Sequence, residues 1–217
     1  MEIKVMKNIL GENDKIAEEN RKFFGEKKIL TVNLMGSPGS GKTSLLEKTL
    51  EKLSGKIKIA VIEGDLFTAK DAERIERQGV QVVQINTSGG CHLDAQMVKR
   101  AAESLNLDEI NLLIVENVGN LVCPAEFDVG ENLKAVVLSI TEGDDKPMKY
   151  PLIFKESAIT LLNKIDLLPF TNFNLESARE DLTTLHPNLK IIETSCTKDS
   201  GIDSWCEWLM EKVGEVK

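Results

Sequence analysis

The 217-residue sequence has few aromatic side chains, which make up 5% of it, and only four cysteines and two histidines. It contains no apolar run close to the roughly 18 residues that a membrane-spanning helix needs. Residues 1–10 show neither the long apolar stretch nor the small-residue cleavage site of a secretory signal. We therefore expect a cytoplasmic protein that does not associate with a membrane.

Basic side chains are also in the minority, because 27 Lys and Arg residues face 35 Asp and Glu residues and the net charge is −8. A chain of this charge has no general attraction to a phosphate backbone, so we expect no nucleic-acid partner. The four scattered cysteines are too few for a disulfide framework in a chain of this length. We expect reduced thiols, some of them available as metal ligands.

Short apolar runs rich in β-branched residues alternate with segments of helical periodicity. The runs are nearly continuous, which is typical of strands buried on both faces of a parallel sheet. The pattern predicts an α/β fold with a doubly wound, mostly parallel seven-stranded sheet. The expected strands are 29–35, 57–63, 80–85, 110–116, 133–141, 158–163 and 189–193, and helical patterns cover 43–53, 69–78, 93–105 and 175–185.

The N-terminal segment precedes the first expected strand. We predict a helix over residues 13–24, because Asn13 can cap its first turn and Gly25 can end it in the left-handed conformation. The face of this helix is largely charged. We interpret residues 1–28 as a helical appendage and residues 29–217 as a P-loop GTPase domain, on the motifs that follow.

Residues 36–43 carry the pattern GxxxxGK[ST], directly after one expected strand and directly before an expected helix. The glycines let backbone N–H groups curl around phosphate oxygens, while Lys42 bridges the β- and γ-phosphates and Thr43 ligates Mg²⁺. The pattern predicts a P-loop NTPase. The expected nucleotide contacts in this segment are Gly36, Ser37, Pro38, Gly39, Ser40, Gly41, Lys42, Thr43 and Ser44.

The base that is bound follows from Asn163-Lys164-Ile165-Asp166, which closes a later strand at the same edge of the sheet. A carboxylate at Asp166 can accept two hydrogen bonds, from the ring N–H and the amino group of guanine, whereas adenine presents no such donor pair. We therefore expect GTP and GDP as ligands, with Asn163, Lys164 and Asp166 at the base. Ser195 and Cys196, after the last strand, resemble the final base-contacting element of GTPases.

Two further strand ends should supply the groups for Mg²⁺ and hydrolysis. Glu116 and Gly119 stand where many GTPases carry DxxG, so Glu116 would hold Mg²⁺ through water and the Gly119 N–H would contact the γ-phosphate. Asp65 would be a Mg²⁺ partner or orient the attacking water, although a helix-capping or solvated role explains it equally well. For Thr68 and Asp71, which follow it, the capping or solvated role is the better explanation. The predicted catalytic residues are Lys42, Asp65, Glu116 and Gly119, and the predicted Mg²⁺ ligands are Thr43, Asp65 and Glu116. We expect slow turnover, because no glutamine or arginine that could assist hydrolysis stands out in the motifs.

A second metal site is suggested by Cys91 and His92, which follow the third strand, and by Cys123, which follows the DxxG-like segment. Both loops are expected on the nucleotide side of the sheet. Two thiolates and an imidazole suit Ni²⁺ or Zn²⁺, while Mg²⁺ prefers oxygen. Ordinary buried cysteines with a loop histidine remain an alternative, because no CxxC pair is present.

Taken in order, GSPGSGKT, EGD, SGGCHLDAQM, ENVGNLVCPAEFD and NKID resemble the HypB GTPases that insert nickel during [NiFe]-hydrogenase maturation. The resemblance runs from about residue 29 to the C-terminus. It implies a homodimer with nickel or zinc on Cys91, His92 and Cys123 near the subunit interface, and a hydrogenase precursor or another nickel-maturation protein as partner. In some members a lysine of one subunit lies near the guanine of the other, and Lys149 is the candidate here. The CxxCGC motif and histidine-rich tract of some relatives are missing, so we expect no metal storage at the N-terminus.

Other functions remain open on the sequence alone. The urease-maturation GTPases resemble this chain in fold and phosphate loop, but Cys123-Pro124 is followed here by Ala125 instead of the histidine of their Cys-Pro-His element, which disfavours this alternative. The chain could instead be a metal-binding module with GTP as a static structural ligand, or an ATP-dependent kinase. We favour a GTPase that gates nickel delivery, because Gly119 and Cys123 share one loop and loss of the γ-phosphate should move a metal ligand.

Overall fold

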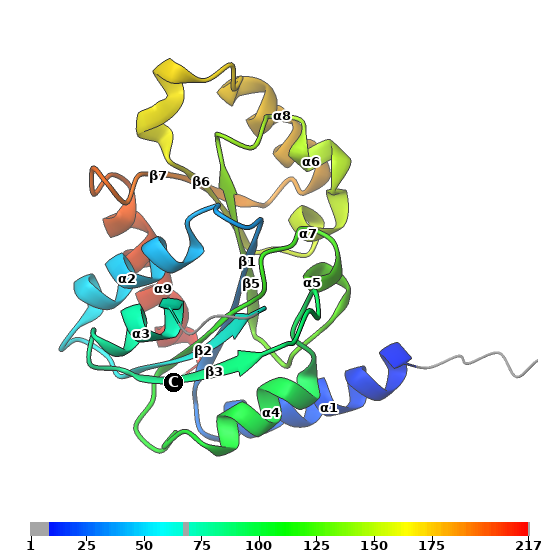
Figure 1. Cartoon of the computed structure of the whole chain (residues 1–217), viewed down its shortest axis with the longest axis vertical. Helices are drawn as coiled ribbons and strands as arrows, with labels where there is room; N and C mark the ends of the chain where they lie inside the picture. The colour runs from blue at the N-terminus through cyan, green and yellow to red at the C-terminus, as the bar shows by residue number, and fades with distance from the viewer. Residues whose placement is uncertain (1–8, 67–69, 217) are drawn as a thin grey trace, which may run out of the picture.

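The computed structural model describes residues 9–66 and 70–216. Seven parallel strands form one sheet in the order β3-β2-β4-β1-β5-β6-β7, which confirms the predicted doubly wound α/β fold (Figure 1). Thr68 lies outside the described residues. The strands are β1 (Leu30–Gly36), β2 (Ile59–Asp65), β3 (Gln81–Asn86), β4 (Leu112–Glu116), β5 (Leu133–Ser139), β6 (Ile159–Asn163) and β7 (Lys190–Thr194).

Helices cover both faces of this sheet (Figure 1). On one face α2 (Lys42–Leu53), α3 (Lys70–Glu76) and α9 (Ile202–Glu215) enclose a core that includes Leu46, Ile75 and Trp205. The other face is covered by α1 (Ile9–Glu26), α4 (Ala95–Glu103), α5 (Cys123–Glu126), α6 (Lys146–Lys149), α7 (Pro151–Lys155) and α8 (Leu175–Leu185), and a 3-10 helix η1 (Ile165–Phe170) follows β6. Among the described residues, no helix combines the length and apolarity needed to cross a bilayer.

The burial of the strands explains their composition. Every residue of β1, β4 and β6 is buried, since helices pack on both sides of the sheet, whereas the edge strands β3 and β7 are partly exposed. Because all strands are parallel, the connections that follow β1, β2, β4, β6 and β7 all leave from the carboxyl-terminal side of the sheet. The predicted site residues, apart from Lys149 on α6, therefore lie at the carboxyl ends of the strands.

Helix α1 differs from the prediction in its ends. Asn13 lies inside the helix, where its Oδ1 accepts from the Ala95 N–H at 2.9 Å and its Nδ2 donates to the Asp128 carbonyl at 2.8 Å. The prediction that Asn13 caps the helix is wrong, because this side chain turns toward the domain. Gly25 is also helical, and the left-handed residue is Lys28 with φ 57°. Phe24 of α1 is buried in the core beside α4, and the division at residues 28 and 29 stays a prediction.

Candidate functional site

The phosphate loop connects the end of β1 with the start of α2. Gly41 precedes α2 with φ 100°, and a Cβ on it would approach the Asn163 Nδ2 to 2.3 Å, so only glycine allows this contact. The Lys42 Nζ lies across the loop and donates to the carbonyl oxygens of Gly36 and Ser37, each at 3.1 Å. Burial lowers the pKa of Lys42, against the opposing influence of Glu116 and Glu63.

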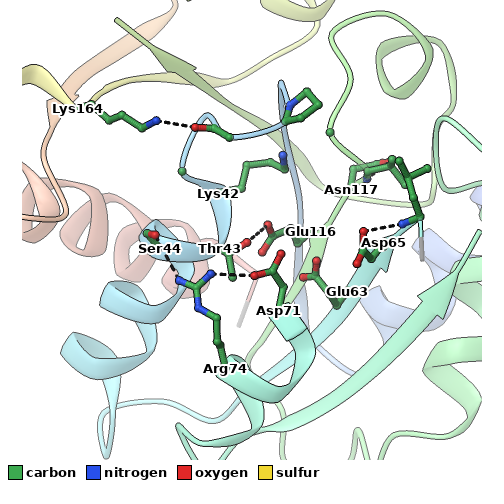
Figure 2. A pocket seen from close by; sticks show the side chains of 17 residues that line it. Lys42, Thr43, Ser44, Glu63, Asp65, Asp71, Arg74, Glu116, Asn117 and Lys164 are labelled. Atoms are coloured by element: carbon green, nitrogen blue, oxygen red, sulfur yellow. Dashed lines mark hydrogen bonds and ion pairs between the residues drawn. The ribbon is translucent and has the colours of Figure 1, made fainter. Parts of the chain in front are cut away.

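A cavity of about 400 Å³ opens beside this loop (Figure 2). Its walls come from the phosphate loop, from the end of β2, from α3 and from residues 116–119. The predicted catalytic residues Lys42, Asp65, Glu116 and Gly119 all line it. Asp71 and Arg74 also line it, and the Arg74 guanidinium donates to the Asp71 Oδ1 at 2.8 Å and to the Glu47 Oε1 at 3.0 Å.

Three oxygen-bearing side chains meet at the base of this cavity. The Thr43 Oγ1 donates to the Glu116 Oε1 at 2.8 Å, and Glu63 is the register partner of Glu116 on the neighbouring strand. Burial raises the pKa of both glutamates, and each also lies near the other. The Oε2 atoms of Glu63 and Glu116 are buried without a hydrogen-bond partner among the described residues. Carboxylate and hydroxyl oxygens in this arrangement fit a hard divalent cation such as Mg²⁺.

Sequence reasoning missed two charged residues of this cavity, Glu63 and Arg74. It placed Asp65 with Thr43 and Glu116, whereas Glu63 is the register partner of Glu116 and the Asp65 Oδ1 accepts from the Leu66 N–H at 2.6 Å. The strand pattern of residues 57–63 puts Glu63 at the strand end, and an acid directly after the apolar run 59–62 was the available signal. Arg74 carries no such signal, because it is one charged residue on a short helix.

The base pocket lies next to the phosphate cavity, with a volume of about 190 Å³. The Asn163 Nδ2 donates to the Ser40 carbonyl at 2.9 Å, and the Lys164 Nζ donates to the Gly39 carbonyl at 2.6 Å. The two oxygens of Asp166 accept from the Ser195 Oγ at 2.5 Å and from the Thr197 Oγ1 at 3.0 Å. The Ser195 hydrogen bond lowers the pKa of Asp166, so this carboxylate is ionised and can accept from a base.

The thiols and the imidazole that are predicted to bind metal lie close together, as their positions on the sheet predict. The Cys91 Sγ lies 2.9 Å from the Cys123 Sγ and 3.5 Å from the His92 Nδ1, and the ligand atoms of all three residues lie within 4.8 Å of one another. The His92 ring stacks on Phe127 with centroids 3.7 Å apart. Burial lowers the pKa of His92, which favours the neutral imidazole that binds metals.

The comparisons with known proteins decide the family. Residues 30–193 match the family described as "CobW/HypB/UreG, nucleotide-binding domain". The chain is 50% identical over 202 residues to the hydrogenase maturation factor HypB of Escherichia coli K12, and this alignment covers 93% of the chain and 70% of that protein. It is 43% identical over 213 residues to a probable hydrogenase maturation factor HypB of Methanocaldococcus jannaschii, covering 98% of this chain and 96% of the relative. The chain belongs to the HypB family.

A solved HypB structure supports the same assignment in three dimensions. The crystal structure of HypB from Helicobacter pylori in complex with nickel superposes with a TM-score of 0.90 at 36% identity, covering 94% of this chain and 96% of that one. The predicted resemblance is thereby confirmed. As a HypB protein, the chain carries the fold of a P-loop GTPase family, while the roles of its individual site residues stay predictions.

One residue implied by the HypB resemblance lies apart from both nucleotide cavities. Lys149 on α6 pairs with Asp145, its side chain is 60% exposed, and it lines neither the phosphate cavity nor the base pocket of its own chain. Large apolar side chains are exposed on nearby segments, with Val122 at 48% and Met148 at 55%. A position at the surface is what a residue serving another subunit requires.

Proposed function

We propose that this chain is a GTP-hydrolysing metallochaperone that gates nickel delivery during hydrogenase maturation. The observation that carries the proposal is the course of the loop after β4. Gly119 is close-packed on the phosphate loop, since a Cβ there would meet the Pro38 Cα at 2.8 Å, and four residues later the same loop bears Cys123. The Asn120 N–H donates to the Gly36 carbonyl at 3.0 Å, while the Asn120 Nδ2 donates to the Cys91 carbonyl at 3.2 Å.

The nucleotide half of the proposal assigns each polar group a task. Lys42 and the backbone N–H groups of the phosphate loop neutralise the phosphates, and Asp166 selects guanine. Thr43, Glu116 and Asp65 are the predicted Mg²⁺ ligands, and Glu63 joins them on the register described above. Mg²⁺ would offset charge that develops on the γ-phosphate. The Arg74 guanidinium is held by Asp71 and Glu47, so this arginine is not free to reach the reaction centre, and we expect slow intrinsic turnover.

In the nickel part of the proposed function, the ion is cargo that the protein delivers. Cys91, His92 and Cys123 provide two sulfurs and one nitrogen, which suit nickel or zinc, and three ligands leave the coordination incomplete. A second copy of the chain could complete it, and the exposed Val122 and Met148 supply apolar surface for such a homodimer. A hydrogenase precursor or another maturation protein in the cytoplasm would receive the ion.

The decisive experiment measures Ni²⁺ and Zn²⁺ affinity by competition with a chelator, with the protein loaded with GDP or with a non-hydrolysable GTP analogue. Light scattering follows the mass in parallel. We expect metal affinity or dimerisation to differ between the two states. GTP turnover that persists in Lys42→Ala would overturn the assigned hydrolytic site, and identical metal affinity and mass in both states would overturn the gating mechanism.

A further inference from the structure

A buried asparagine stands between the nucleotide cavity and the metal ligands. Asn117 directly follows Glu116 at the end of β4, is 1% exposed and lines the phosphate cavity, where Figure 2 shows it across from Ser44 and Arg74. Its Oδ1 accepts two backbone N–H groups, from Val118 at 3.0 Å and from Leu93 at 3.1 Å. Its Nδ2 donates to the Asn33 Oδ1 at 3.1 Å. One side-chain oxygen thus joins the loop that precedes Gly119 to the residue that follows His92.

Leu93 is held from a second direction. Its side chain is fully buried and packs on Gly64, where an added Cβ would meet the Leu93 Cδ1 at 2.8 Å. Gly64 lies between Glu63 and Asp65 on β2, and all three line the phosphate cavity. The segment that carries His92 is therefore fastened to the ends of both β2 and β4, the two strand ends that bear the acidic groups of the cavity.

From this arrangement, which rests on the proposed function, we infer that Asn117 is the positioning residue that couples the nucleotide state to His92. Val118 and Leu93 donate to the same oxygen, so a change in the 117–119 backbone changes the support of the His92 segment. Cys123 moves with this loop covalently, whereas the His92 segment is joined to it by non-covalent contacts on both sides of His92. On one side the Asn120 Nδ2 donates to the Cys91 carbonyl, and on the other the Leu93 N–H donates to Asn117. Of these two hydrogen bonds, the one to Asn117 is buried and starts at the residue that follows Glu116.

The test measures Ni²⁺ affinity of the full chain with GDP and with a non-hydrolysable GTP analogue, and reports the ratio of the two affinities. In Asn117→Ala both N–H groups lose their acceptor. We expect the ratio of the two affinities to move at least halfway from its wild-type value to one on a logarithmic scale. Asn117→Asp keeps an accepting oxygen and should retain more of the ratio than Asn117→Ala. A merely structural role would lower both affinities by the same factor and leave the ratio unchanged.

Asn20→Ala is the matched control. Asn20 is 2% exposed, and its Nδ2 donates to the carbonyls of Ala95 at 2.8 Å and Val129 at 3.0 Å, so it supports segments near the metal ligands without lining the phosphate cavity. We expect this variant to keep the wild-type ratio. Thermal unfolding of all variants shows whether they are folded at the assay temperature.

The outcomes separate this inference from the proposed function. A wild-type ratio of one refutes the gating mechanism itself. A wild-type ratio that differs from one and is unchanged in folded Asn117→Ala overturns the role of Asn117 alone. If Asn117→Ala does not fold, Asn117→Leu decides, because it fills similar space without an accepting oxygen: a ratio closer to one than that of Asn20→Ala supports the inference, and an equal ratio overturns it.

Discussion

The Sγ atoms of Cys91 and Cys123 lie 2.9 Å apart although 32 residues separate them in the sequence. Cys91 follows β3 and Cys123 begins α5 after β4, so the parallel sheet brings both connections to one edge. The hydrogen bond with the Cys91 side chain is the largest cause that raises the pKa of Cys123, followed by burial and by repulsion from a charge on Cys91. A divalent cation bound by both sulfurs would remove that repulsion, so the pair is a better candidate metal site than either thiol alone.

Removal of one thiol should therefore abolish tight metal binding. For Cys123→Ala we expect Ni²⁺ and Zn²⁺ affinity to fall by about 100-fold or more, since loss of groups outside the ligand shell already costs about 10–100-fold. Competition with a chromogenic chelator measures this affinity. Cys196→Ala is the control, because the Cys196 Sγ lies near the Asn163 Oδ1 at 3.9 Å in the base pocket and should leave metal affinity unchanged. Equal affinities in wild type and Cys123→Ala would refute the ligand assignment.

The assignment of guanine makes an equally direct prediction. Asp166→Asn keeps one accepting oxygen but replaces the other by a donor, so one of the two hydrogen bonds to guanine is lost. Xanthine has a carbonyl in place of the amino group of guanine, and the new amide donor can bond to that carbonyl. We expect GTP affinity to fall by at least about 100-fold and xanthosine triphosphate to bind more tightly than GTP. Titration with fluorescent nucleotides checks both values. Asp166→Ala should lose GTP without gaining the xanthine nucleotide, and an unchanged preference for GTP in Asp166→Asn would contradict the base assignment.

Motifs whose residues are adjacent in sequence were predictable, because the phosphate loop and Asn163 to Asp166 carry their geometry locally. The approach of Cys91 to Cys123 followed from parallel strands alone. The pairing of Glu63 with Glu116 did not, because it depends on the register between β2 and β4, and a shift by two residues would place Asp65 there instead. Asn13 was read as a cap from its immediate neighbours, while its actual partners, Ala95 and Asp128, lie far along the chain.

The buried Glu131 is expected to make the free energy of unfolding depend on pH. It is 6% exposed, and burial, followed by the nearby Asp128, raises its pKa from 4.5 to about 7. A carboxyl whose pKa is raised on folding stabilises the protein while it is protonated, so its contribution is present below 4.5 and is lost as pH rises through about 7. Although burial opposes the shift, hydrogen bonds with Glu131, the Gly130 N–H and Arg21 lower the pKa of Asp128, so Asp128 affects stability at a lower pH than Glu131 does.

The corresponding variant is Glu131→Gln, which resembles the protonated carboxyl at every pH. Between about pH 5 and pH 8 we expect the wild type to lose up to about 3 kcal/mol of unfolding free energy relative to this variant. Urea denaturation at several pH values measures the difference, and subtraction of the two curves removes the titration of other groups. A difference that stays constant across this range would show that Glu131 keeps an ordinary pKa.

A last prediction concerns the packing of α9 on α2, which supports the phosphate loop from behind. Trp205 is 1% exposed, and its indole N–H donates to the Thr49 Oγ1 at 2.9 Å. Thr49→Val preserves shape but leaves this N–H without its acceptor, so we expect a loss of about 1–3 kcal/mol of unfolding free energy. Thr183→Val on α8 is the matched control, because the Thr183 hydroxyl is exposed and only bonds carbonyls of its own helix, and its change should stay within about 0.5 kcal/mol. Equal losses in the two variants, measured by urea denaturation, would mean that the Trp205 bond contributes no net stability and that apolar contacts alone hold α9 in place.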